Sequence, residues 1–110
     1  MKLLTKDIER KLIQQFEQED TPNKKPYLKL FGGSSATWLI SEYNKDEGMY
    51  FGLCDLGLGT PELGYVSKDE IEALRCPPFG LPVERDRFFE PKKTLTEYAT
   101  DARTKGSIVD

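Results

Sequence analysis

The chain has no histidine, two cysteines, two methionines and one tryptophan among its 110 residues. Without histidine, the Ser–His and Cys–His pairs that activate a nucleophile are excluded. Two cysteines without histidine also cannot supply the four ligands of a structural zinc site. We therefore expect no metal and no cofactor. Cys54 and Cys76 are expected to be buried or half-buried free thiols rather than a disulfide.

Long apolar runs are also missing. No segment approaches the length of a membrane-spanning helix, and the N-terminal residues carry too few apolar side chains for a signal peptide. We therefore expect a cytoplasmic protein without membrane association. The length corresponds to one domain, residues 1–110, whose last residues we expect to be frayed.

Apolar spacing and turn residues predict an α+β fold with an antiparallel sheet of about four strands. An N-terminal helix precedes the sheet, a short helix follows strand four, and a C-terminal helix ends the chain. The predicted strands are Tyr27–Phe31, Ala36–Tyr43, Met49–Leu56 and Leu63–Val66. Strict alternation in the second strand would place Ala36, Trp38, Ile40 and Glu42 on one face, and Thr37, Leu39, Ser41 and Tyr43 on the other.

Helix ends are indicated by capping residues. Thr5 can cap the first helix, and Ser67 and Thr94 each stand three residues before a glutamate, as in a capping box. The short helix cannot pass Cys76, because two prolines follow it. The last helix should end near Gly106.

The net charge of −3 is unevenly spread. Residues 42–74 carry two basic and eight acidic side chains, whereas residues 1–41 carry seven basic and five acidic ones. An acidic middle third disfavours a nucleic-acid surface there. The glycine-rich segment Gly57–Gly64 is interpreted as a hairpin turn rather than a phosphate loop, because a strand and not a helix follows it.

The densest charged cluster is Glu84-Arg-Asp-Arg87, between Pro82 and Pro91. Arg85 and Arg87 could clamp a carboxylate or phosphate, with Glu84 and Asp86 orienting them. The favoured alternative is an edge strand with a local salt-bridge network, anchored on the core by Phe88 or Phe89.

Three carboxylates, Glu42, Asp55 and Glu62, lie on or beside neighbouring predicted strands and could perform acid–base chemistry if they converged. Aromatic residues such as Trp38 and Tyr65 would crowd the sheet. They could stack nucleic-acid bases, but these strands have almost no basic residues, so core packing explains the rings more simply.

Several segments together resemble the uncharacterised domain-of-unknown-function family 2958. They are Trp38-Leu-Ile-Ser-Glu-Tyr43, Phe51-Gly-Leu53, Glu62-Leu-Gly-Tyr-Val-Ser67 and Gly80-Leu-Pro-Val-Glu-Arg-Asp86. The similarity runs roughly from Leu4 to Pro91, with the last helix outside it. The resemblance implies a small bacterial protein encoded on plasmids, integrative elements or phages. It implies no activity and no catalytic residue.

Three hypotheses follow. The first is a non-enzymatic interaction module of a mobile element that binds an unidentified protein partner, with Glu84, Arg85, Asp86, Arg87, Tyr65 and Trp38 as candidate binding residues. The second is nucleic-acid binding through basic residues near the termini. These are Lys2, Lys6, Arg10, Lys11, Lys24, Lys25, Lys92 and Lys93. The third is a small enzyme that uses Glu42, Asp55 or Glu62.

Overall fold

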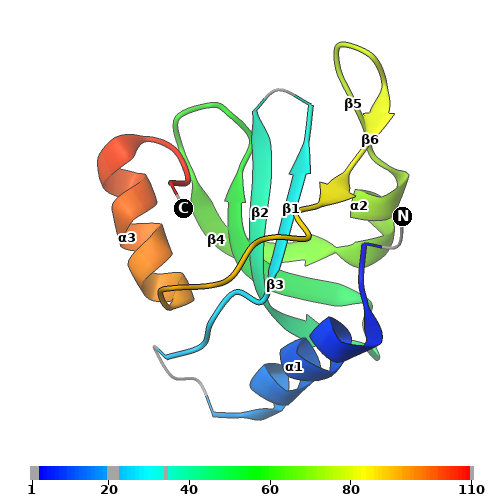
Figure 1. The fold of residues 1–110 in the computed structure, drawn as a ribbon, viewed down its shortest axis with the longest axis vertical. Coiled ribbons are helices and arrows are strands. Elements are labelled where there is room, and N and C mark those ends of the chain that lie inside the picture. Colours follow the sequence, from blue (N-terminus) through cyan, green and yellow to red (C-terminus); the bar gives the residue numbers. More distant parts are fainter. Residues whose placement is uncertain (1–2, 20–22, 34, 110) are drawn as a thin grey trace.

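The computed structural model describes residues 3–19, 23–33 and 35–109. Within these residues, three helices and seven strands follow one another (Figure 1). They are α1 (Lys6–Glu17), β1 (Leu28–Gly32), β2 (Ala36–Asn44), β3 (Met49–Asp55), β4 (Glu62–Ser67), α2 (Lys68–Ala73), β5 (Arg75–Cys76), β6 (Leu81–Pro82), β7 (Glu84–Arg85) and α3 (Leu95–Lys105).

The main sheet is antiparallel, with the strand order β4-β3-β2-β1-β7. This confirms the predicted α+β fold and its three helices. The fifth strand, β7, belongs to the charged segment that was expected at an edge, and it pairs with β1. The second sheet, the short β5–β6 hairpin, was not expected.

The helix ends follow their capping residues. The Thr5 hydroxyl accepts a hydrogen bond from the N–H of Ile8, and Thr94 and Glu97 form both halves of a capping box. The Ser67 hydroxyl accepts from the N–H of Glu70. Gly106 ends α3 with a φ of 76°, in the left-handed region that favours glycine. Each end is thus set by local hydrogen bonds that the sequence reveals.

Both faces of the sheet are covered. On the first face, apolar residues of β1, β2 and β3 pack against Leu12 of α1 and Ile71 of α2. On the second face, Leu39 and Leu53 pack against α3, with Phe89 beside them. Phe89 is therefore the anchor of the charged segment, whereas Phe88 is 87% exposed.

The predicted faces of β2 are wrong beyond Ile40. The register with β3 shifts between Ile40 and Glu42, so that Ser41 is an extra residue in a β-bulge. The bulge reverses the alternation. Tyr43 joins Tyr50 on the first face, and Glu42 lies opposite Phe51 on the second.

Gln15 of α1 holds this bulge in place. Its amide nitrogen donates to the carbonyl oxygen of Ser41 at 2.6 Å and to that of Lys25 at 2.8 Å. Its amide oxygen accepts from the N–H of Lys25 at 3.0 Å. One side chain thereby satisfies three backbone groups of two different segments.

We expect Gln15→Ala to lower the free energy of unfolding by about 2–3 kcal/mol, because it leaves these backbone groups without hydrogen-bond partners where they are shielded from solvent. Chemical denaturation measures the difference. Gln14 is exposed on the same helix, and Gln14→Ala, the matched control, should change stability by less than about 0.5 kcal/mol. Equal effects of the two substitutions would contradict this role of Gln15.

Candidate functional site

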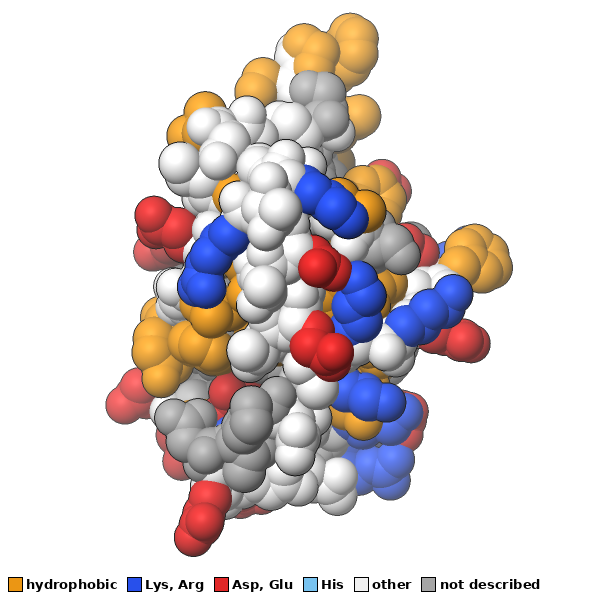
Figure 2. All heavy atoms as spheres, turned by 90° about the vertical axis from the view of Figure 1, so that its left-hand side faces the viewer, with side chains coloured by type: hydrophobic (Ala, Val, Ile, Leu, Met, Phe, Trp, Pro, Cys, Tyr) orange, Lys and Arg blue, Asp and Glu red, His pale blue; other side chains and the backbone are white. Residues whose placement is uncertain are grey.

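Uncharged residues gather at one end of the molecule. Three connections lie there: the β1–β2 turn, the β3–β4 loop and the tip of the β5–β6 hairpin (Figure 1). No charged residue occurs in segments 30–41, 56–61 and 76–83, which contain these connections, although charged residues form 32% of the chain. Figure 2 shows hydrophobic side chains at this end, while the acidic and basic side chains in that view lie below it. We call this region the apolar end.

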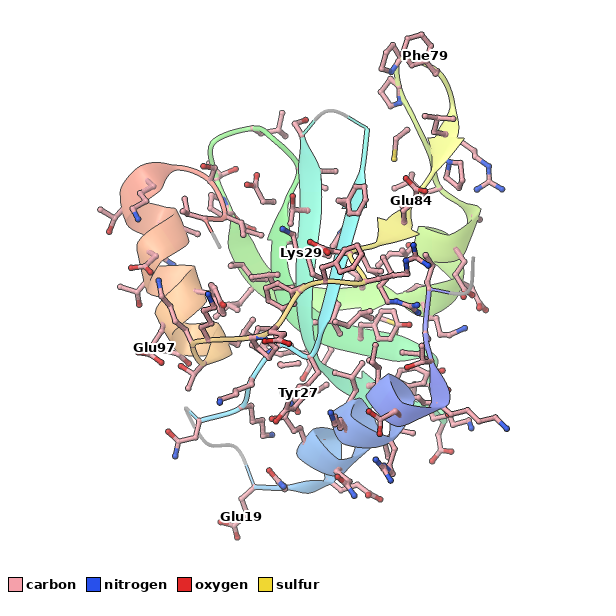
Figure 3. The ribbon with its side chains drawn as sticks, viewed as in Figure 1. Glu19, Tyr27, Lys29, Phe79, Glu84 and Glu97 are labelled. Carbon is pink, nitrogen blue, oxygen red and sulfur yellow. The ribbon has the colours of Figure 1, made fainter. Side chains whose placement is uncertain are left out.

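Large side chains at the apolar end are open to solvent. Phe79 at the hairpin tip is 81% exposed and Leu58 in the β3–β4 loop is 77% exposed. Leu56 and Leu81 are also exposed. Figure 3 shows Phe79 at the far tip of the hairpin, and Glu84 close to its base. Large exposed apolar side chains gathered at one end of a molecule are typical of interaction sites.

Three hollows connect the apolar end with β4. The first, about 310 Å³, lies beneath the hairpin and includes Phe31 and Phe79 in its lining. The second, about 180 Å³, shares Gly32, Gly33, Cys76 and Pro77 with the first. The third, about 360 Å³, shares Trp38 and Leu74 with the second and ends at Tyr65. Because neighbouring hollows share lining residues, they form a continuous apolar track.

A fourth hollow, the largest of these four at about 580 Å³, has a different character. Five of the nine residues that line it are charged: Glu9, Lys68, Glu72, Arg75 and Glu84. Lys68 pairs with Glu72 at 3.0 Å, and Glu9 pairs with Lys45 at 3.0 Å. Since much of this charge is already neutralised by local ion pairs, we take the apolar track rather than the largest hollow as the candidate site.

Of the six residues expected to bind a partner, three line the apolar track and three do not. Trp38 and Tyr65 line the apolar track, although Trp38 is itself only 3% exposed. Glu84 lies at the rim of the first hollow.

The other three, Arg85, Asp86 and Arg87, do not line the track. The carboxylate of Asp86 accepts from the N–H of Phe88 at 2.9 Å and lies 3.7 Å from the ammonium of Lys29. Its backbone N–H donates to the carbonyl of Lys29 at 3.0 Å. These contacts hold the end of β7 against β1.

Six apolar residues of the apolar end and the track were not among the predicted binding residues, most of which belong to the charged cluster. They are Phe31, Leu56, Leu58, Leu74, Phe79 and Leu81. A usable signal existed: turn segments rich in glycine and proline normally carry polar residues, whereas segments 56–61 and 76–83 contain exposed leucine and phenylalanine and no charge.

The three candidate carboxylates do not converge. Asp55 is buried, and its two oxygens accept from the N–H groups of Gly57 at 2.8 Å and Ile108 at 2.9 Å. Glu42 lies opposite Phe51 of β3. Phe51 is four positions from Asp55 in the same strand, which corresponds to about 13 Å at the usual rise of a strand. Glu62 is exposed at the start of β4. No acid–base pair is formed among them.

The thiols are also poorly suited to chemistry. Both cysteines are free, as expected, with Cys76 buried and Cys54 half-buried. Burial raises the pKa of the Cys54 thiol to about 11, so that little reactive thiolate exists at neutral pH. Among the residues that the structure describes, no group of three potential metal ligands is present and no helix is long and apolar enough to cross a membrane.

Four of the eight basic residues proposed for nucleic-acid binding, Arg10, Lys11, Lys24 and Lys93, pair with carboxylates. Arg10 and Lys11 both pair with Asp7, and Lys93 pairs with Asp101. Lys24 is buried. Lys2 lies outside the described residues. Pairing with carboxylates reduces the positive charge available to phosphates.

A family model described as "Protein of unknown function (DUF2958)" matches residues 3–109. The chain belongs to the DUF2958 family. The match includes α3, so the expectation that the last helix lies outside the family segment is wrong. Helix α3 closes the second face of the sheet, so it packs into the same core as the rest of the matched segment. No curated protein and no solved structure shows significant similarity to the chain.

In this DUF2958 protein, Lys24 and Glu42 form a buried ion pair at 3.1 Å, with side-chain exposures of 7% and 14%. We expect Lys24→Met to destabilise the fold by about 3 kcal/mol, because it leaves the Glu42 carboxylate buried without a counter-ion. The double variant Lys24→Met with Glu42→Leu should lose less than the single variant, as chemical denaturation can measure.

The exposed pair Lys45–Glu9 provides the control, since its lysine side chain is 64% exposed. Lys45→Met should cost at most about 1 kcal/mol. A Lys24→Met variant as stable as Lys45→Met would mean that the Glu42 carboxylate is well hydrated and open to other roles.

Proposed function

We propose that this DUF2958 protein is a non-enzymatic interaction module that binds a protein partner at its apolar end. The observation that carries the proposal is the convergence of three charge-free connections, with Phe79 and Leu58 exposed among them. Keeping such side chains in water is unfavourable, and covering one phenylalanine contributes about 2–3 kcal/mol. A partner that covers the apolar end therefore gains affinity from groups that add nothing to the fold.

The form of the apolar end suits a protein partner. Aromatic side chains that fill a partner's pocket are common binding hot spots, and Phe79 projects beyond the body of the molecule (Figure 3). The hollow beneath the hairpin can in turn accept an apolar side chain of the partner. Glu70, Arg75 and Glu84 at the borders of the track would form the polar rim that surrounds many interfaces.

The partner's surface should itself be mainly uncharged. A charged side chain placed against Phe79 or Leu58 would lose its hydration without gaining a counter-ion, because the three connecting segments carry no charge. We propose that the module serves a mobile genetic element in the bacterial cytoplasm and meets a protein of the element or of its host. This setting rests on the family resemblance.

We expect Phe79→Asp to weaken partner binding by about 2 kcal/mol, roughly thirtyfold, because it removes the projecting ring and introduces a charge that the interface cannot neutralise. Phe88→Asp is the matched control, since Phe88 is 87% exposed but lies outside the apolar end. The measurement is affinity purification of tagged protein from its native cells, with and without nuclease, read by quantitative mass spectrometry.

A protein recovered in stoichiometric amount with the wild type and with Phe88→Asp, but lost with Phe79→Asp, supports the proposal. Equal recovery with both variants would place the interface elsewhere, and the exposed face of Glu84 and Arg87 would be the next surface to substitute. Loss of every partner after nuclease treatment would instead favour nucleic-acid binding.

A further inference from the structure

The two edges of the main sheet differ in how well they are protected against pairing with another strand. Strand β7 forms one edge and has only two residues, both charged. No longer strand pairs with this side of β1. Strand β4 has six residues in regular register with β3 and contains no lysine, arginine or proline. Natural proteins usually protect an edge by short length, charge, proline or a bulge. By these criteria β7 is protected and β4 is not.

The register shows which backbone groups β4 presents at its free edge. The N–H of Lys68 donates to the carbonyl of Gly48 at 2.9 Å, so the pair Gly48–Lys68 is a hydrogen-bonded pair. Such pairs alternate in an antiparallel ladder, so Val66 and Gly64 also bond toward β3. Leu63, Tyr65 and Ser67 therefore direct their N–H groups to the free edge. Among the described residues, no backbone hydrogen bond from another element reaches them.

We propose that the β4 edge pairs with β4 of a second copy of this chain, antiparallel and centred on Tyr65. In this register Tyr65 lies opposite its own equivalent, and Leu63 lies opposite Ser67 of the second copy. The two Tyr65 residues exchange two hydrogen bonds, and each Ser67 N–H donates to a Leu63 carbonyl. The Ser67 carbonyl is left out, because the cap residue of a helix already accepts a bond within that helix. About four backbone hydrogen bonds result.

The side chains match in this register. Gly64 lies opposite Val66 of the second copy, and a Cβ atom added to Gly64 would meet nothing within 4 Å, so there is room for the valine. Glu62, the only charged residue of β4, lies opposite Lys68 of the second copy, whose ammonium also pairs with Glu72 of its own helix at 3.0 Å. Opposite charges across a strand pair are favourable, and in the dimer Glu62 would share the Lys68 ammonium with Glu72.

Other symmetric registers fit less well. Centring on Gly64 would place Glu62 opposite Val66, without charge complementarity. Centring on Leu63 would bring the Pro61 region into the ladder, where a proline donates no hydrogen bond. The register centred on Tyr65 also uses the whole length of β4. Phe79 and the β5–β6 hairpin take no part in the pairing, so this inference does not rest on the proposed partner binding.

The first experiment is sedimentation velocity of the purified full chain over a range of concentrations up to about 0.5 mM, together with hydrogen–deuterium exchange. We expect a concentration-dependent dimer. The amides of Tyr65 and Ser67 should be protected only at the higher concentrations, whereas those of Gly64 and Val66, bonded to β3, should be protected throughout. A monomer over the whole range, or unprotected Tyr65 and Ser67 amides in the dimer, would overturn the proposal.

Two substitutions separate backbone pairing from side-chain contact. Tyr65→Pro removes the outward N–H without breaking a bond to β3, and should weaken the dimer by about tenfold or more. Tyr65→Val keeps the N–H and removes the ring, and should weaken it much less. Glu62→Lys, which places a lysine opposite Lys68 of the second copy, should weaken it severalfold.

Thermal unfolding checks that each variant is folded. If Tyr65→Pro does not fold, the amide protection pattern of the wild type and the Glu62→Lys variant still test the proposal. Dimerisation unchanged by Glu62→Lys, or equally weakened by Tyr65→Pro and Tyr65→Val, would overturn the pairing described here.

Discussion

The hydrogen bond from Gln15 to the Ser41 carbonyl is the contact on which the arrangement of the sheet depends. A bulge leaves an extra residue outside the ladder, and its backbone needs a partner from elsewhere. Gln15 supplies it from α1 and also holds Lys25, just before β1. The same bulge turns Tyr43 toward the first face and Glu42 toward Lys24. A core residue and a buried ion pair thus both follow from one irregular position in β2.

Covering both faces of the sheet restricts where the protein can meet another molecule. Helices α1 and α2 occupy the first face and α3 occupies much of the second. What is left are the ends of the strands and the edges of the sheet. The apolar end lies at the strand ends, and β4 is the less protected edge. Both proposed interfaces therefore arise from the same architecture, and neither uses Glu42, Asp55 or the thiols, which are engaged in the fold or poorly reactive.

Local interactions explain what could be predicted. Thr5, Thr94 and Gly106 act within one helical turn of their own positions, so each helix end could be found without tertiary information. The candidate site is the opposite case. The cluster Glu84–Arg87 was predicted to bind a partner because its charges are adjacent in the chain. Only Glu84 lines the track. Phe79 and Leu58 are more than 20 positions apart and belong to connections of two different sheets, so only the packing of the whole chain puts them at the same end of the molecule.

The amino-acid sequence by itself determined the α+β class, the helix boundaries, the antiparallel connections and the absence of histidine-based chemistry, because each depends on residue type or on neighbours a few positions away. Tertiary structure alone decided the bulge at Ser41, the faces of Glu42 and Tyr43, and the convergence of three uncharged connections. These depend on contacts between distant segments, such as Gln15 with Ser41. No local pattern encodes such contacts, since their free energy appears only when the segments pack together.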